Sequence, residues 1–338
     1  MASGRLRAIV LVGGEGTRLR PLTLTRPKPM LPIAGVAIIE RKLRHLAAHG
    51  ITEAVLSLGY KPDAFLQAFP DSEVAGVRLL YAIEPSPLDT AGAVRFAADR
   101  AGYRADDGDD APIVVVNGDV LTELDLTEQL AFHRSRGAEA TIALTQVDDP
   151  SAFGVVPTDT DQRVIAFVEK PSRQDAPTDW INAGAYVLAP SVLGRIPMGE
   201  RTSIERTTFP LIVADGGLYA THSPAYWIDA GTPATYLQAN LDSLASGSEP
   251  FGAGARIDGQ VTNSVIGAGS IIEAGAIVEC SVLLPGVRVS AGAVVRDSIV
   301  GENASIGDRA SICAHTVVGD GGRVEPGSRH EDARIAPA

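Results

Sequence analysis

The segment Arg7–Arg20, RAIVLVGGEGTRLR, joins a short apolar run to a loop rich in glycine. The run from Arg7 to Val12 has the length and the β-branched content of a buried strand. The glycines that follow, Gly13, Gly14 and Gly16, let the backbone turn its N–H groups toward an anion. Arg18 adds a guanidinium that can pair with phosphate oxygens. Alone, the loop is weak evidence, because its spacing matches neither the P-loop nor G-x-G-x-x-G.

Strand-like and helical segments alternate through the first 250 residues. The further strand candidates are Ala54–Leu58, Val77–Ile83 and Ile113–Val116, and the helix candidates are the face formed by Ile39, Leu43, Leu46 and Ala47 and the run Ala91–Arg100. This alternation predicts a Rossmann-like, doubly wound α/β sheet that is covered on both faces. Ligands of such sheets bind at the carboxyl ends of the strands.

The overall composition narrows the classes of partner. The 338 residues carry 29 basic and 41 acidic side chains, a net charge of −12, which argues against nucleic acid or an anionic membrane surface as the main partner. No apolar stretch is long enough to span a bilayer, and the N-terminal residues lead directly into a strand, so we expect a cytoplasmic protein. Cys280 and Cys313 are isolated, and we expect them to be small buried apolar residues.

The last 88 residues differ from the rest of the chain. They hold 14 of the 35 glycines and a single aromatic residue, Phe251. Aliphatic residues recur there every six positions: Ile266, Ile272, Val278 and Leu284, then Val289 and Val295, then Val300, Ile306, Ile312, Val318 and Val324. This period predicts a solenoid of short strands, three to a coil and about four coils in all, and resembles the left-handed parallel β-helix of hexapeptide-repeat proteins. A β-sandwich is the alternative, but it would need longer alternating strands and core aromatics.

The composition shift also divides the chain. The segment Ser243–Gly254 is rich in Ser, Gly and Pro. We therefore predict a catalytic domain over residues 1–245, a linker over 246–254 and a β-helix domain over 255–338.

Two lysines and two aspartates complete the candidate chemistry. Only four lysines occur among 29 basic residues, and Lys28 and Lys170 are each followed by proline, in RPKP and VEKP. Asp119 follows the strand candidate that ends in NG, and Asp229 lies in YWIDAGTPATY. Two carboxylates at strand ends can hold one Mg²⁺ whose remaining ligands are substrate phosphates.

Together, these motifs resemble the sugar-1-phosphate nucleotidyltransferase family. The resemblance rests on GGEGTRLRPLTLTRPKPMLP, NGD, FVEKP, NAGAYVL and WIDAGTPATYLQAN, which occur in the family's order. It implies an enzyme with a mixed sheet of the nucleotidyltransferase A type. The implied reaction transfers a nucleotidyl group from an NTP to a sugar 1-phosphate, with Mg²⁺ as cofactor.

The resemblance also implies roles for particular residues. Arg18, Lys28 and Lys170 would be catalytic, and Asp119 and Asp229 would bind the metal. Nucleotide binding would fall to Leu11, Gly13, Gly14, Gly16, Thr17, Arg18, Lys28, Thr90, Gly92, Asn117 and Gly118. The sugar phosphate would contact Gly154, Glu169, Lys170 and Asn182.

The substrate pair is less sharply indicated. The run Thr90–Ala93, TAGA, is closest to guanylyltransferases, so GTP with mannose 1-phosphate is favoured, although Leu88-Asp89 departs from the usual Leu-Gly. UTP or dTTP with glucose 1-phosphate is the alternative. A non-catalytic regulatory homologue and an acyl-transferring β-helix are more remote. We expect the β-helix to assemble a homo-oligomer, a dimer or a tetramer.

Overall fold

The computed structural model describes residues 6–103 and 111–338. The chain divides into two compact units. The sheet unit comprises Met1–Gly13 and Glu40–Trp227, and the β-helix unit comprises Gly14–Ile39 and Ile228–Ala338. The domain boundaries predicted from the sequence, at residues 245 and 255, concern domains that fold independently. They stay a prediction.

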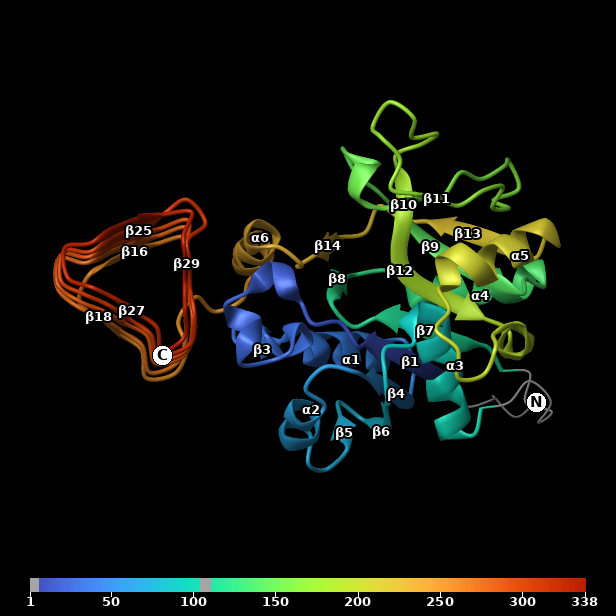
Figure 1. Ribbon diagram of the computed structural model, residues 1–338, viewed down its shortest axis with the longest axis horizontal. Coiled ribbons are helices and arrows are strands. Elements are labelled where there is room, and N and C mark those ends of the chain that lie inside the picture. Colours follow the sequence, from blue (N-terminus) through green and yellow to red (C-terminus); the bar gives the residue numbers. More distant parts are fainter. Residues whose placement is uncertain (1–5, 104–110) are drawn as a thin grey trace. The chain divides into compact units, whose positions relative to one another are not determined.

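A mixed sheet forms the centre of the sheet unit (Figure 1). Its strands are β1 (Arg7–Val12), β4 (Glu53–Leu58), β5 (Glu73–Val74), β6 (Val77–Ile83), β7 (Ile113–Asn117), β9 (Ala140–Gln146), β10 (Gly154–Val155), β11 (Val168–Glu169), β12 (Trp180–Leu188) and β13 (Leu218–His222). The order is β13-β9-β12-β7-β1-β4-β6-β5, with β10 paired to β12 and β11 to β10. β1, β4, β6 and β7 run parallel, whereas β12 is antiparallel to β7 and β9. The predicted α/β fold with a mixed sheet is confirmed.

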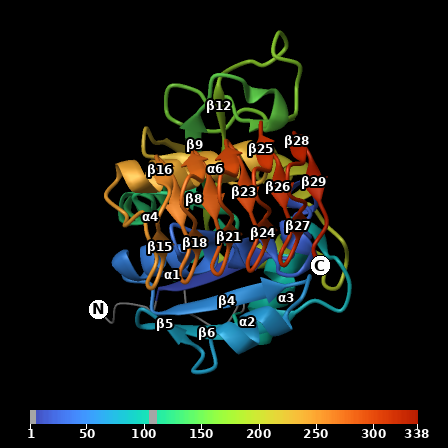
Figure 2. The ribbon, with the colours of Figure 1, turned by 90° about the vertical axis from the view of Figure 1, so that its left-hand side faces the viewer.

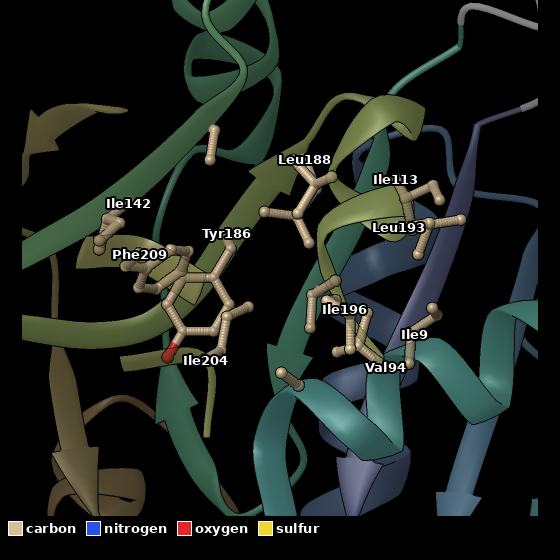
Figure 3. Close-up of a cluster of buried hydrophobic side chains, with 14 of the residues drawn as sticks. Ile9, Val94, Ile113, Ile142, Tyr186, Leu188, Leu193, Ile196, Ile204 and Phe209 are labelled. Carbon is tan, nitrogen blue, oxygen red and sulfur yellow. The ribbon is translucent and has the colours of Figure 1, made fainter. Parts of the chain in front are cut away.

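Helices cover this sheet. They are α1 (Ile38–Ala48), α2 (Asp63–Ala68), α3 (Asp89–Ala101), α4 (Leu126–Arg136) and α5 (Phe209–Ala214), with short helical turns at Pro150–Ala152, Pro190–Arg195 and Ile204–Thr208. α3 packs on β1, β4 and β6, and α4 packs on β9, β12 and β13. Figure 3 shows part of the core between these layers, where Val94 of α3 lies near Ile9 of β1 and Phe209 of α5 lies beside Tyr186 of β12. No helix in the described part of the chain has the length and apolarity to cross a membrane.

The strand order creates a switch point between β1 and β7. From β1 the chain continues to β4 and β6 on one side and then returns to β7 on the other side. Leu11 of β1 is in register with Asn117 of β7, so the carboxyl ends of both strands meet. Gly118 follows immediately, and a Cβ there would lie 2.2 Å from Val12 Cγ1, so only glycine fits. Crevices at such points are where α/β sheets bind ligands.

The β-helix unit contains a stack of five coils, one more than the sequence predicts (Figures 1 and 2). Its first face is β15 (Arg256–Ile257), β18 (Ile271–Ile272), β21 (Arg288–Val289), β24 (Ser305–Ile306) and β27 (Arg323–Val324). The second is β16 (Gln260–Thr262), β19 (Ile277–Glu279), β22 (Val294–Arg296), β25 (Ser311–Cys313) and β28 (Arg329–Glu331). The third is β17 (Val265–Ile266), β20 (Val282–Leu283), β23 (Ile299–Val300), β26 (Val317–Val318) and β29 (Arg334–Ile335). All neighbouring strands are parallel.

In the first three coils, one corner interrupts the six-residue period, because one side of the coil is a residue shorter. Ile266 pairs with Leu283, not with the predicted Leu284, because the side of the coil after Val278 is one residue short. A residue with positive φ makes that tight corner, and Cys280 at φ 46° is one example. Cys280 and Cys313 are therefore half-buried corner and strand-end residues rather than the buried core residues expected.

Two earlier stretches of the chain belong to the β-helix unit. The first, Gly14–Ile39, carries three 3₁₀ turns, Thr17–Leu19, Leu22–Leu24 and Lys28–Met30, and the hairpin of β2 (Pro32–Ile33) and β3 (Val36–Ala37). The second contains α6 (Pro233–Ala245), which begins at a Thr232 capping box and packs on β2 and β17. Phe251, in the predicted linker, already forms a parallel bridge with Ile266.

The stacked aliphatic column makes the coils interdependent. Ile271 and Ile272 are neighbours in β18, but only Ile272 is fully buried in the column. We expect Ile272→Ala to lower the free energy of unfolding by about 2–5 kcal/mol, because it leaves a cavity. The matched variant Ile271→Ala should cost well under half as much. Urea denaturation of both variants tests this, and equal losses would contradict an inward column at residue 272.

Candidate active site

The glycine loop after β1 presents backbone donors to solvent. Gly13, Gly14 and Glu15 are exposed. Among the residues that the structure describes, no protein group accepts a hydrogen bond from the backbone N–H of Gly14, Glu15 or Gly16. Such free N–H groups in a glycine loop suit an anion. Thr17, in the 3₁₀ turn that follows, is exposed as well.

A buried lysine lies at the base of this loop within the β-helix unit. The Lys28 side chain is 4% exposed, and its Nζ donates a 2.7 Å hydrogen bond to Asp229 Oδ1. Arg18, which is 64% exposed, lies 3.4 Å from Asp229 Oδ2. One carboxylate therefore joins two of the predicted catalytic cations.

Two glycines make room for this arrangement. Gly16 has φ 62°, and a Cβ there would lie 2.9 Å from Lys28 Cβ. A Cβ at Gly231 would lie 2.6 Å from Arg18 Nη2 and 2.8 Å from Asp229 Oδ1. A side chain at either position would displace the charged groups, so both glycines are part of the site's geometry.

The sheet unit supplies the predicted residues at the ends of β1 and β7. Leu11, Asn117 and Gly118 lie together there, and the Gly118 N–H donates to Leu11 O at 2.9 Å. Asp119 follows and is half-buried. Lys42 of α1 is buried nearby: burial lowers the pKa of Lys42 to about 8, and the charge of Asp119 opposes that shift. Asp119 thus lies close to the buried side chain of Lys42.

A polar cavity of about 440 Å³ opens in the sheet unit. Its lining residues are Asp89, Ala152, Phe153, Gly154, Glu169, Lys170, Asn182, Arg201, Ser203, Glu205 and Arg206. All four residues predicted to contact a sugar phosphate, Gly154, Glu169, Lys170 and Asn182, are among them. The cavity offers three cations and three carboxylates, an arrangement suited to a ligand with both a phosphate and hydroxyl groups.

One wall of the cavity comes from the short strands β10 and β11. Gly154 is in register with Glu169, and a Cβ on Gly154 would lie 2.6 Å from the Phe167 ring. Lys170 adopts φ 48° and its N–H donates to Phe153 O at 3.0 Å. Its Nζ lies 3.4 Å from Glu169 Oε1, which is also 3.7 Å from Arg206 Nη2. Glu169 thus partly neutralises two cations that could meet a phosphate.

Another part of the cavity lining is held by a chain of hydrogen bonds. A bulge at Gly184, φ 72°, lets its N–H donate to Asn182 Oδ1 at 2.9 Å, and Asn182 Nδ2 donates to the Tyr186 hydroxyl at 2.8 Å. Burial, and then the charge of Glu205, raises the pKa of Tyr186 well above its ordinary value. Glu205 in turn accepts hydrogen bonds from Thr90 at 2.7 Å and Ser203 at 2.8 Å. The orientation of the Asn182 amide is therefore fixed by buried partners.

Two of the residues predicted to bind nucleotide have structural partners of their own. Gly92 is buried in α3, and a Cβ there would lie 2.5 Å from the carbonyl oxygen of Glu200. Thr90 Oγ1 accepts the Ile204 N–H at 2.8 Å as well as donating to Glu205. Both therefore anchor residues 200–205, and their nucleotide contacts stay a prediction.

The sequence reasoning missed the segment Arg201–Arg206, RTSIER. Arg201, Glu205 and Arg206 all line the cavity. The clustering of these charged residues in the sequence is a signal that could have identified the segment. It also missed Glu84, whose carboxylate accepts hydrogen bonds from Ser57 Oγ at 3.0 Å and from the Leu88 N–H at 3.1 Å. Glu84 lies under the glycine loop, with Oε1 at 3.4 Å from a Cβ position on Gly13.

Few of the described side chains are grouped so that they could bind a metal ion. In residues 6–103 and 111–338 no group of three or more His, Cys, Asp or Glu side chains could hold an ion by itself. Asp119 belongs to the sheet unit and Asp229 to the β-helix unit. Their joint binding of a metal stays a prediction.

Comparison with known proteins agrees with these features. Residues 7–246 match the family model described as nucleotidyl transferase, and residues 248–338 match a model described as the GMPPB C-terminal domain. The chain is 45% identical to mannose-1-phosphate guanylyltransferase of Mycobacterium tuberculosis over 74% of its length and 67% of that protein. It is 41% identical to a probable mannose-1-phosphate guanylyltransferase 1 of rice over 78% of its length and 74% of that protein.

Solved structures agree on the fold. HddC from Yersinia pseudotuberculosis is 29% identical and superimposes with a TM-score of 0.59, covering 70% of this chain and 99% of that one. A putative glucose-1-phosphate thymidylyltransferase from Bacillus anthracis, at 24% identity, gives a TM-score of 0.63 over 72% and 96% of the two chains. With a family model that spans most of its length, the chain belongs to the nucleotidyl transferase family of enzymes.

Proposed function

We propose that this enzyme transfers a guanylyl group from GTP to mannose 1-phosphate, giving GDP-mannose and pyrophosphate. The observation that carries the proposal is the 440 Å³ cavity in which all four predicted sugar-phosphate residues meet. The relatives named as mannose-1-phosphate guanylyltransferases support the choice of substrates, because they are 41–45% identical over about three quarters of the chain.

The cavity's chemistry matches a sugar phosphate. Lys170 and Arg206 would bind the phosphate oxygens, and Glu169 and Asn182 would bind ring hydroxyls, since a carboxylate accepts and an amide both donates and accepts. Because Asn182 is held by Gly184 and Tyr186, it would meet the sugar in a fixed orientation. Fixed partners discriminate between sugars that differ in one hydroxyl position.

The glycine loop would hold the triphosphate. The free N–H groups of residues 14–16 would bind its oxygens, with Arg18 on the departing pyrophosphate and Lys28 at the α-phosphate. A phosphate oxygen of the sugar would attack the α-phosphorus in line while the bond to the bridging oxygen of the pyrophosphate breaks. No side chain forms a covalent bond in this scheme, so catalysis is positioning and charge neutralisation.

We assign a magnesium ion to Asp119 and Asp229. Asp119 and Asp229 are hard oxygen donors, and Mg²⁺ is commonly held by one or two carboxylates together with substrate phosphates. Asp229 already pairs with Lys28 and Arg18, so an ion that binds this carboxylate would compete with these two cations. When bound, the ion would neutralise phosphate charge and orient the triphosphate.

The substrate choice has a direct test. We expect pyrophosphate release, measured over five nucleoside triphosphates and several sugar 1-phosphates, to give the highest kcat/KM with GTP and mannose 1-phosphate. A maximum with UTP or dTTP and glucose 1-phosphate would replace the proposed substrates. No release with any pair would support a regulatory homologue.

A metal titration tests Asp229. We expect Asp229→Asn to raise the Mg²⁺ concentration for half-maximal activity by about tenfold or more, because one hard ligand is lost. The matched control is Asp258→Asn, which removes an exposed carboxylate of the β-helix. A titration curve identical to that of the unmodified enzyme would remove Asp229 from the metal site.

We also propose that the enzyme is cytoplasmic. A separate proposal is that the β-helix mediates self-association. Light scattering should therefore give a mass of two or four times the 35.2 kDa of one chain. A mass of a single chain across working concentrations would contradict this assignment.

A further inference from the structure

The β-helix contacts the segment that carries Lys28. Arg26 lies two residues before Lys28, and its guanidinium binds Glu302 through two hydrogen bonds, Nη1 to Oε1 at 2.9 Å and Nη2 to Oε2 at 2.5 Å. The same Nη2 donates to Asp320 Oδ2 at 2.9 Å. The three side chains are 21%, 32% and 13% exposed, so the cluster is largely shielded from solvent.

The two acids are held in place by the β-helix itself. Glu302 follows β23 and Asp320 follows β26, at the same corner of two adjacent coils. The Glu302 N–H donates to Asp320 Oδ1 at 2.8 Å. Thr25 Oγ1 also donates to Asp320 Oδ2, at 2.5 Å. The coils thus present a pre-formed pair of carboxylates that can accept hydrogen bonds from a guanidinium.

The connection from Arg26 to Lys28 is short and stiff. Pro27 and Pro29 flank Lys28, and each ring fixes its own φ. Lys28 opens the 3₁₀ turn Lys28–Met30 directly after Pro27. While Arg26 is anchored, Lys28 therefore has little freedom to move.

The far end of the segment is anchored as well. Tyr236 Oη donates to Pro32 O at 2.5 Å, and the Ala34 N–H donates to Asn240 Oδ1 at 2.9 Å. Both partners lie on α6, which packs on β17. The segment from residue 25 to 34 is thus fixed at both ends to parts of the β-helix unit.

We infer that Arg26 is a positioning residue, through which Glu302 and Asp320 of the β-helix hold Lys28 against Asp229. The β-helix is then part of the catalytic apparatus and not only a surface for association. The kinetic consequence rests on the proposed function. Displacement of a catalytic group by about 1 Å can lower a rate by about a hundredfold.

Kinetics of the full-length enzyme test this. We expect Arg26→Gln and Glu302→Gln each to lower kcat by about 10- to 100-fold with little change in the KM of either substrate. Arg26→Lys should recover only part of the loss, because an ammonium cannot make the two parallel bonds. Glu325→Gln, which removes an exposed carboxylate at a β-helix corner, is the matched control and should keep the original kcat. A kcat for Arg26→Gln within twofold of that control would overturn the inference.

Hydrogen–deuterium exchange of the same variants separates the inference from the proposed function. Residues 17–33 should exchange faster in Arg26→Gln and Glu302→Gln than in Glu325→Gln, with the β-helix coils unchanged. This result would support the anchoring even if GTP and mannose 1-phosphate proved to be the wrong substrates. Unaltered exchange in residues 17–33, or an equal increase over the whole chain, would count against a local anchor.

Discussion

The ion pair between Lys28 and Asp229 is the constraint on which the β-helix unit's part of the site depends. A lysine that is 4% exposed must have a charged partner, since an unpaired buried ammonium loses its hydration without compensation. Asp229 supplies that partner, and Gly16 and Gly231 leave the space for it. Three sequence motifs, GGEGTR, RPKP and WIDAG, are therefore held together by one carboxylate. Loss of any of these residues would affect the other two motifs.

The sequence was a good guide to the fold where a local pattern carries the information. Val77–Ile83 was predicted with the bounds of β6, because a run of apolar and β-branched residues has few other uses in a parallel sheet. The β-helix period was also visible. The coil count fell one short because the register breaks near Pro285 and because the period from Ile266 to Val324 leaves out Ile257 and Val261 of the first coil and His330 of the last. The shift from Leu284 to Leu283 could not be foreseen, because a tight corner with positive φ shortens a side without any glycine to mark it.

The site was less predictable, because its contacts join distant parts of the chain. Lys28 and Asp229 were both singled out, but as a phosphate ligand and a metal ligand, and nothing in the sequence shows that they bond across 201 positions. Gly92 was assigned to the nucleotide, which stays a prediction, and the close approach of the Glu200 carbonyl to it could not be read from the sequence. The clustered charges around Glu205 and Arg206 were visible in the sequence, but the π-helical turn that brings both into the cavity lining has no clear sequence signature.

If the proposed sugar-phosphate site is this cavity, its balance of charges bears on how an acidic protein would select a phosphorylated sugar. The cavity lining carries three cations and three carboxylates, so it is close to neutral and has little general attraction for polyanions. Lys170 and Arg206 are each within 3.7 Å of Glu169. A phosphate that enters competes with Glu169 for both cations. A ligand whose sugar hydroxyls reach the released carboxylate restores the lost interactions. Glu169 would then act as an internal competitor that makes binding of the phosphate depend on the sugar attached to it.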